Sequence, residues 1–303
     1  MAETIELRLP RREPYAGRAL LAVLDARAVT GLERMGPDGS YVRTLALPGG
    51  PGVAHLRPAD GPDVRGELRL TDPRDADEAV RRLRHLLDLD ADPGVVDALL
   101  GADPALAASV RERPGLRVLG TVDGLELALR AVIGQQVSVA AARTVLGRVV
   151  VAHGPAVPAA LDPEPGPEPL RLLPAAATIA ALPDEALAMP RSRAATVRRV
   201  AAAVSDGTLD LRAGGDPAAA TAALLAVSGV GPWTAGYVAM RALGDRDAFP
   251  ATDLVLRQAA ALLGLPSEAR ALARHAGRWA PWRAYAAQHL WAVAAASRVA
   301  PRG

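Results

Sequence analysis

The hydrophobic periodicity changes near residue 120, and this change constrains the fold more than any other feature of the chain. Before residue 120, short runs such as 5–9 and 41–47 alternate apolar and polar residues, which is the period of a half-buried β-strand. After it, apolar residues recur with the period of an α-helix. A chain of 303 residues is long enough for about two domains. We therefore predict an α+β fold, with an N-terminal α+β domain over 1–119 and an all-α region over 120–303.

The N-terminal segment carries the turn residues of a curved antiparallel sheet. Glycine, proline and aspartate favour tight turns because of their backbone preferences and short polar side chains. Such turns are expected at Pro37-Asp38-Gly39, Pro48-Gly49-Gly50-Pro51 and Asp60-Gly61-Pro62. The expected elements are strands over 5–9, 41–47, 53–56 and 64–70, with helices over 17–28 and 80–87.

The C-terminal segment reads as a series of helices joined by short turns. Asp123 and Glu126 have the spacing of a capping box, and Ser138 can cap a second helix that runs to about residue 152. Gln135 and Gln136 then lie in the tight turn between these two helices. The proline-rich stretch 155–174 is expected to be an extended surface loop. Further helices are expected over 192–205, 217–226, 233–243, 254–263, 267–276 and 282–298.

Two residue types are missing, and their absence excludes several enzyme classes. The chain has no cysteine, so it can form no disulfide, cysteine-ligated zinc site or iron–sulfur cluster. It also has no lysine, because all 35 basic residues are arginine. A lysine Schiff base, a pyridoxal anchor and a phosphate-loop lysine are therefore excluded.

The start of the chain and the charge distribution suggest where the protein acts and what it binds. Residues 1–15 are charged and lack the apolar core of a signal peptide, and arginines interrupt every apolar stretch of membrane-spanning length. We expect a soluble cytoplasmic protein with no membrane partner. The net charge is −2 over 1–119 and +4 over 120–303, so the C-terminal part is the better candidate for an anionic partner.

The segment 224–235, Leu-Leu-Ala-Val-Ser-Gly-Val-Gly-Pro-Trp-Thr-Ala, is the most informative motif. One helix ends near Val227, Gly229 and Gly231 permit a tight hairpin, and Pro232 suits the first turn of the next helix. Backbone amides at such a helix N-terminus can bind a phosphate. The alternative is an ordinary helical hairpin whose glycines allow close packing. The whole string, rather than its glycines alone, favours phosphate binding.

Two further segments carry candidate functional side chains. Asp253 stands where a helix begins, and an ionised acid there could stabilise a cation or orient water. Taken alone, it is better explained as an N-cap that serves only the helix. Trp291 lies on a helix among small residues such as Ala287 and Ala294, which leaves room for a flat partner. Its alternative role is to fill a core pocket.

Together these motifs resemble the helix–hairpin–helix DNA glycosylases, and within them the AlkA type, 3-methyladenine DNA glycosylase II. The resemblance spans nearly the whole chain. The hairpin followed by an aspartate is typical of the superfamily, and the tryptophan-bearing last helix with the preceding α+β domain indicates this branch. The segments that carry the resemblance are 127–140, 188–193, 228–235, 249–253 and 281–285, followed by Trp291.

The resemblance implies roles for individual residues. Asp253 would be the catalytic residue, and the base pocket would be lined by Trp233, Tyr237 and Trp291. A structural Na⁺ or K⁺ would bind the backbone carbonyls of Leu225, Val227 and Val230, with no cofactor needed for catalysis. The predicted DNA-binding residues are Gln135, Gln136, Ser228, Gly229, Val230, Gly231 and Thr234.

The same resemblance implies a function. The protein would be a monofunctional glycosylase that acts as a monomer on nucleoid DNA, releasing alkylated purines such as 3-methyladenine and 7-methylguanine from the duplex. Gln136 occupies the position where the best-known members have a leucine wedge, so this chain would fill the gap with a polar side chain. A lyase-active glycosylase for oxidised bases would need a lysine. The other alternative is a non-catalytic helix–hairpin–helix module that binds damaged DNA.

Overall fold

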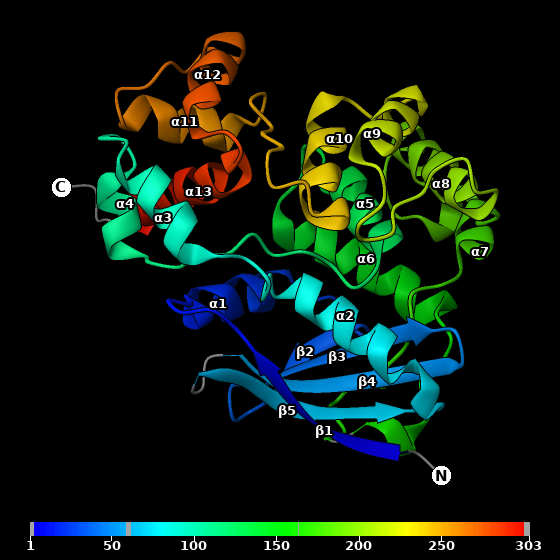
Figure 1. The fold of residues 1–303 in the computed structure, drawn as a ribbon. Coiled ribbons are helices and arrows are strands. Elements are labelled where there is room, and N and C mark those ends of the chain that lie inside the picture. Colours follow the sequence, from blue (N-terminus) through cyan, green and yellow to red (C-terminus); the bar gives the residue numbers. More distant parts are fainter. Residues whose placement is uncertain (1–2, 59–61, 163, 300–303) are drawn as a thin grey trace.

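A computed structural model describes residues 3–58, 62–162 and 164–299, and it confirms the α+β fold with an antiparallel sheet followed by many helices (Figure 1). The sheet has five strands in the order β1-β5-β4-β3-β2, and every neighbouring pair is antiparallel. Two positions of a predicted turn, Asp60 and Gly61, lie outside the described residues. The strands are β1 (Glu3–Pro10), β2 (Glu33–Met35), β3 (Tyr41–Leu47), β4 (Gly50–Arg57) and β5 (Asp63–Leu70).

Two helices cover one face of the sheet. These are α1 (Gly17–Arg27) and α2 (Ala76–Leu86), of which α2 runs across the strands in Figure 1. Leu20 of α1 and Leu83 of α2 are buried in one core with inward residues of the strands, such as Leu56 and Leu68. The predicted strands and helices of this part are therefore confirmed. The short β2 and the helices over 93–101 and 107–112 were not predicted.

The opposite face of the sheet is also covered, which the sequence did not predict. The segment 155–174 was expected to be an extended surface loop, and many of its residues are exposed. However, Val157, Leu161 and Leu170 are buried against Val42 and Val53 on this second face. The loop thereby ties the sheet to the helical part of the chain, and strands β3 and β4 are buried on both faces.

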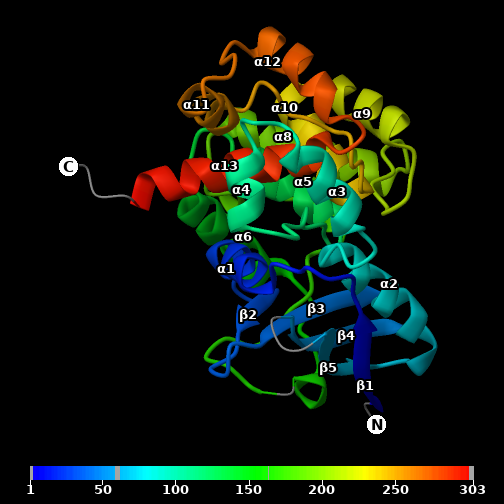
Figure 2. The ribbon, with the colours of Figure 1, turned by 60° about the vertical axis from the view of Figure 1, so that its left-hand side comes forward.

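The helical part forms two lobes. The first helical lobe has one continuous core made by α5 to α10. The second helical lobe contains α3, α4 and α11 to α13, which share a separate core around Trp279 and Tyr285. Figure 2 shows the last helix, α13, lying across α3 and α4. The bounds are α3 (Pro93–Gly101), α4 (Ala107–Glu112), α5 (Gly124–Ile133), α6 (Val139–His153), α7 (Ala176–Ala180), α8 (Arg191–Ser205), α9 (Pro217–Ala226), α10 (Pro232–Val238), α11 (Leu254–Leu262), α12 (Ala269–Ala276) and α13 (Arg283–Val299).

Helices α3 and α4 lie before residue 119 in the chain but pack in the second helical lobe. Asp92 caps α3 by accepting the amide hydrogens of Gly94 and Val95, and Pro93 occupies its first turn. The division of the sequence at residue 119 stays a prediction. No helix of the described residues is long and apolar enough to span a lipid bilayer.

A buried ion network joins the sheet to the first helical lobe. Arg43 of β3 pairs with Glu126 of α5 and with Glu33, and Arg130 pairs with the same two carboxylates. This network corrects the predicted capping box. Asp123 does accept the amide hydrogen of Glu126 at 3.0 Å, but the Glu126 carboxylate is used by the arginines and not by the backbone. The box fails because a buried carboxylate requires a charged partner.

Candidate functional site

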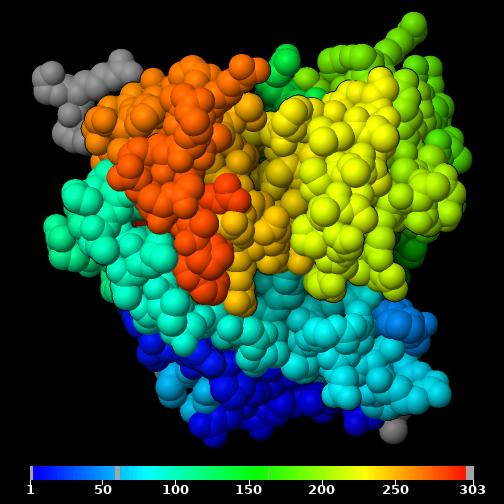
Figure 3. Space-filling model, turned by 45° about the horizontal axis from the view of Figure 1, so that its top comes forward, coloured from blue at the N-terminus to red at the C-terminus, as the bar shows by residue number. Residues whose placement is uncertain are grey.

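The two helical lobes face each other across a hollow. Figure 3 shows this hollow between the orange helices of the second helical lobe and the yellow helices of the first, with the gold segment that joins α10 to α11 between them. The predicted site residues come from both sides of it. The hairpin and α10 belong to the first helical lobe, whereas α11 and α13 belong to the second. A site at such a junction can take a ligand that neither lobe could hold alone.

The hairpin between α9 and α10 folds as its glycines predict, although the two glycines act differently. Gly229 has a φ of +95°, and a Cβ placed there would lie 2.0 Å from the Thr196 hydroxyl of α8. It must therefore be glycine, for both its backbone conformation and its packing. Ser228 beside it is exposed, and its carbonyl accepts hydrogen bonds from Thr196 and Arg199.

Gly231 has an ordinary extended backbone, and a Cβ added there would meet no described atom within 4 Å. As the N-cap of α10 it offers no side chain to the first-turn amides, so these amides remain available to another partner. Pro232 follows at the first helical position, as predicted. Neither the backbone conformation nor the packing of the described residues therefore requires a glycine at position 231. Its lack of a side chain leaves space at the N-terminus of α10.

Asp253 is the N-cap of α11 and also the centre of the site. Its Oδ1 accepts the backbone amide hydrogen of Leu256 at 2.8 Å, which is the capping bond. The same oxygen accepts the indole hydrogen of Trp291 at 3.3 Å, and Oδ2 accepts that of Trp233 at 2.6 Å. Because a carboxylate oxygen can accept two hydrogen bonds, Oδ2 keeps one acceptor position. The residue is 9% exposed, so the carboxylate, held by these hydrogen bonds, is largely shielded from water.

Three aromatic rings surround this carboxylate. Trp233 stacks on Tyr237 with ring centroids 5.4 Å apart and planes 11° from parallel. Tyr237 meets Trp291 edge to face at 6.2 Å. All three rings are only partly buried, so Trp291 does not merely fill a core pocket. The structure therefore brings the predicted aromatic set together around Asp253.

The phenol of Tyr237 is held by arginine. It accepts a hydrogen bond from Arg241, whose guanidinium also donates to the backbone carbonyl of Leu119. Burial alone would raise the pKa of Tyr237, but Arg241 and Arg27 outweigh it and bring the pKa below its ordinary value. Neither arginine stands in the recognised motifs, so neither was predicted as a site residue.

The turn between α5 and α6 carries two glutamines that have different environments. Gln135 turns back to the hairpin, where its side-chain amide donates to the Thr234 hydroxyl at 3.0 Å and to the Gly229 carbonyl at 3.3 Å. Gln136 is exposed and has a φ of +58°, which is uncommon for a residue with a Cβ. The turn therefore presents Gln136 outward while Gln135 holds the turn against the hairpin.

Several large apolar side chains in or beside the predicted motifs are exposed. Val137 and Val139 follow Gln136 and are 41% and 50% exposed, while Leu254 beside Asp253 is 63% exposed. Leu225 at the hairpin is also exposed. Exposed apolar groups that gather beside polar ones are typical of binding surfaces. Sequence periodicity cannot identify them, because it does not show which helical face is left uncovered.

The predicted carbonyl ligands lie where the hairpin leaves α9. Val230 is buried and donates its amide hydrogen to the Val227 carbonyl at 3.0 Å. Leu225 lies in the last turn of α9, where carbonyls lack intrahelical partners and the helix dipole favours a cation.

The chain is similar to curated proteins over most of its length. Residues 6–123 match the family model "AlkA N-terminal domain". A DNA-3-methyladenine glycosylase 2 from Escherichia coli is 37% identical, with 92% of this chain and 94% of that protein covered. A "Probable bifunctional transcriptional activator/DNA repair enzyme AlkA" from Mycobacterium tuberculosis is 49% identical over 96% of this chain. The chain spans 57% of that mycobacterial relative's length.

Solved structures have the same fold at lower identity. A 3-methyladenine DNA glycosylase from Archaeoglobus fulgidus superposes with a TM-score of 0.75 at 20% identity, covering 98% of this chain and 99% of that one. An 8-oxoguanine glycosylase/lyase from Clostridium acetobutylicum, in complex with double-stranded DNA, gives 0.70 at 19% identity, covering 91% of this chain and 92% of that one. The family assignment rests on the closer sequence relatives and the matched N-terminal domain. The chain therefore belongs to the AlkA family of helix–hairpin–helix DNA glycosylases.

Proposed function

We propose that this protein is a monofunctional DNA glycosylase, which binds duplex DNA, flips out an alkylated purine and hydrolyses its N-glycosidic bond. The observation that carries the proposal is the Asp253 carboxylate, which two indoles and one backbone amide hold beside an aromatic set. The family relatives support the same activity. The chain would act as a monomer on nucleoid DNA in the cytoplasm.

The aromatic set suits a flat cationic base. The target base lies inside the duplex, so flipping it out costs a few kcal/mol. Stacking on an aromatic ring returns about 1–3 kcal/mol per base. An alkylated purine carries positive charge, so an electron-rich indole adds a cation–π attraction of about 2 kcal/mol in a desolvated site. Trp233, Tyr237 and Trp291 would therefore favour charged bases over normal ones.

The chemistry needs only the carboxylate and a water molecule. The bond between the sugar C1′ and the base breaks, and the base leaves with the bonding electron pair. The sugar becomes oxocarbenium-like, and the negative charge of Asp253 would stabilise it. Water then adds to C1′ and its proton passes to the solvent, which leaves an abasic site in an intact strand. Because the chain has no lysine, no lysine amine can form the Schiff base of a lyase reaction.

The hairpin and the α5–α6 turn would hold the DNA. The free first-turn amides that follow Gly231 suit a phosphate oxygen, and exposed Ser228 lies at the same end of α10. Thr234 is buried and would act through its hydrogen bond from Gln135. Gln136 projects from its turn and would fill the gap left by the flipped base by hydrogen bonding to the orphaned partner. A Na⁺ or K⁺ on the carbonyls of Leu225, Val227 and Val230 would stiffen the hairpin.

Base release from methylated DNA distinguishes this proposal from a module that only binds damage. Duplex DNA treated with a methylating agent is incubated with the protein, and free bases are separated by chromatography. We expect 3-methyladenine and 7-methylguanine in the soluble fraction. Tight binding to the methylated duplex without any free base would support the non-catalytic module instead.

Gly231 gives a direct test of the phosphate contact. In Gly231→Ala the added methyl group meets no described atom of the protein, so we expect unchanged thermal stability. The methyl group would obstruct a phosphate at the first-turn amides and weaken binding to an abasic duplex about threefold to tenfold, the equivalent of one lost hydrogen bond. Fluorescence anisotropy measures the affinity. Gly277→Ala is the matched control, since that added Cβ is also unobstructed. Wild-type DNA affinity in both variants would show that no phosphate binds beside Gly231.

The indole hydrogen of Trp233 is expected to position Asp253. Trp233→Phe keeps an aromatic ring that can stack but removes the donor to Oδ2. Because hydrogen bonds to charged groups contribute about 1.5–3 kcal/mol, we expect at least a tenfold slower single-turnover base release with nearly unchanged DNA affinity. Trp282→Phe, which changes an indole packed on Tyr285, is the control. An unchanged release rate in Trp233→Phe would show that the ring alone matters.

A further inference from the structure

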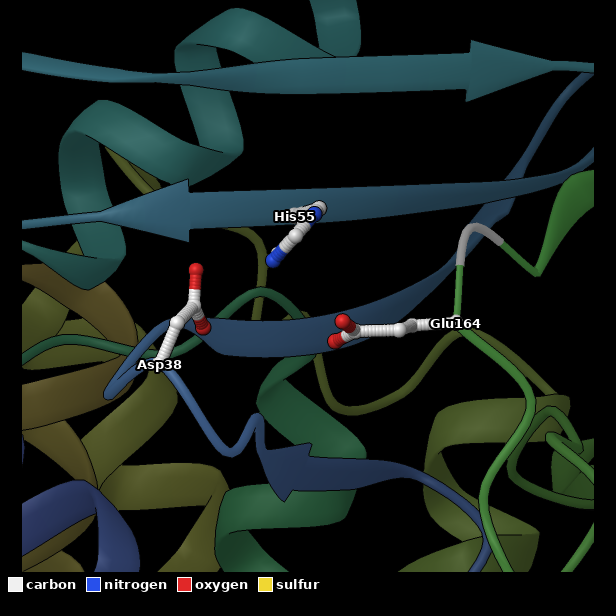
Figure 4. Close-up of side chains that lie close together, drawn as sticks. All are labelled: Asp38, His55 and Glu164. Carbon is white, nitrogen blue, oxygen red and sulfur yellow. The ribbon is translucent and has the colours of Figure 1, made fainter.

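Three ligand-type side chains meet on the second face of the sheet, the face covered by the segment 155–174. Asp38 comes from the β2–β3 turn, His55 from β4 and Glu164 from the segment after α6, and Figure 4 shows them pointing toward one another. One ligand atom of each lies within 4.8 Å of the others. Figure 1 places this sheet at the opposite end of the molecule from α10 and α11, so the cluster is separate from the Asp253 site.

His55 lacks a partner that its burial requires. The residue is 8% exposed, and its Nε2 is buried and makes no hydrogen bond within the described part of the chain. A buried polar atom without a partner costs free energy, so such atoms usually have a hydrogen bond or an ion. Neutral imidazole nitrogen is a common metal ligand. The orphaned nitrogen, which points at two carboxylates, therefore indicates a bound group.

The two carboxylates lie beside the backbone of Gly36. A Cβ built on Gly36 would lie 3.0 Å from Asp38 Oδ1 and 3.2 Å from Glu164 Oε2, and closer still to the Ser40 hydroxyl. The missing side chain of Gly36 therefore lets these three oxygens approach the backbone and one another closely. Two tetrahedral ligands of zinc lie about 3.4 Å apart, so the exposed carboxylates would need to move by about an ångström.

The local charge also favours a cation. Asp38 forms an ion pair with Arg57 at 2.7 Å through Oδ2, and Oδ1 accepts the Ser40 amide hydrogen at 3.0 Å. Hydrogen bonds from Ser40 and Arg57 lower the pKa of Asp38 below its ordinary value. Arg34 donates to the backbone carbonyl of Glu164 and pairs with Asp162. Within the described residues, the carboxylates of Asp38, Asp162 and Glu164 therefore outnumber the two arginines beside them, Arg57 and Arg34.

We propose that Asp38, His55 and Glu164 bind a divalent transition-metal cation of the zinc type, with water completing the coordination. One nitrogen and two carboxylate oxygens suit zinc, whereas magnesium prefers oxygen ligands alone. The three ligands come from separate segments, two on the sheet and one on the segment that returns from the helical part. The cation would fasten this segment onto the sheet and stabilise the folded chain.

The test titrates Zn²⁺ alone into the metal-free full chain against a chromophoric chelator, with thermal unfolding as a second measurement. We expect one Zn²⁺ per chain and a higher Tm. Glu164→Gln and Asp38→Asn change exposed side chains, so they should fold, and each should weaken Zn²⁺ at least about tenfold and abolish the Tm increase. Glu168→Gln, from the same segment, and His153→Gln, an exposed histidine of α6, are the matched controls.

Bound Co²⁺ gives a readout of the nitrogen ligand. The wild-type chain should give visible absorption bands that are altered in His55→Asn, while both control variants should match the wild type. Three results would overturn the proposal: no Zn²⁺ bound by the wild type, equal Zn²⁺ affinity in Glu164→Gln and wild type, or Mg²⁺ bound as tightly as Zn²⁺. Equal affinity for Mg²⁺ and Zn²⁺ would show that the carboxylates alone bind the cation and that the His55 imidazole is not a ligand.

Discussion

Asp253→Asn should release alkylated purine at least about a hundredfold more slowly than the wild type, because the charge that stabilises the oxocarbenium-like sugar is lost. The fold should survive. Asparagine is as good an N-cap as aspartate, so its oxygen can still accept the amide hydrogen of Leu256. DNA binding should also remain, since the hairpin is unchanged. Single-turnover release of 7-methylguanine from a duplex, together with affinity for an abasic duplex, separates these effects.

The control for this substitution is Asp92→Asn. Asp92 also caps a helix, accepting the amide hydrogens of Gly94 and Val95, but it lies at the start of α3 and outside the aromatic set. The same chemical change there should leave base release unaltered. If Asp253→Asn released base at the wild-type rate, Asp253 would be only an N-cap and would have no part in catalysis.

Arg43→Met should destabilise the folded chain by about 3–5 kcal/mol, because it leaves two buried carboxylates with a single arginine. In the wild type, Arg43 and Arg130 balance Glu33 and Glu126, and the Tyr41 hydroxyl donates to Glu33. Methionine fills similar volume without a charge, so the loss is electrostatic more than steric. The free energy of unfolding from urea denaturation measures it.

A double variant tests whether the unpaired charge is the cause. Arg43→Met combined with Glu126→Gln leaves Glu33 paired with Arg130, so we expect it to recover part of the lost stability. Arg212→Met removes an arginine of an exposed pair with Asp210 and should not change stability measurably. Wild-type stability in the Arg43→Met single variant would show that the network contributes nothing.

The same network predicts how stability depends on pH. Burial alone would raise the pKa of Glu33, but Arg130, Arg43 and the Tyr41 hydroxyl lower it to about 2. Since this pKa is below the unfolded value, the unfolded chain binds the proton more readily. The stability that Glu33 contributes is therefore complete above about pH 4.5 and decreases as the pH falls toward 2.

Local patterns predicted the elements that depend on neighbouring residues. The hairpin at Gly229 and the cap at Asp253 follow from residue types within a few positions, and the structure forms both. The sheet and the long helices follow from periodicity and turn residues in the same way. The α+β fold with its antiparallel sheet was therefore predictable, and the sequence motifs were enough to identify the family.

Contacts between distant segments were beyond such patterns. Glu126 looked like half of a capping box, but its partner Arg43 lies 83 residues away. The indole hydrogen of Trp291 reaches Asp253 across 38 residues, so the sequence could suggest a shared pocket but not this bond. The burial of the second face of the sheet under Leu161 and Leu170 likewise depends on where a loop returns. These features arise from tertiary packing, which the hydrophobic periodicity of a short segment does not predict.

In the proposed mechanism, a carboxylate and aromatic rings release an alkylated purine without cutting the strand. One measurement tests it most directly: single-turnover reaction of the wild-type chain with a duplex that contains one 7-methylguanine, in the presence of borohydride. We expect free 7-methylguanine, an intact strand with an abasic site, and no covalent protein–DNA adduct. A cleaved strand accompanied by a borohydride-trapped adduct, or no release of the base, would contradict it.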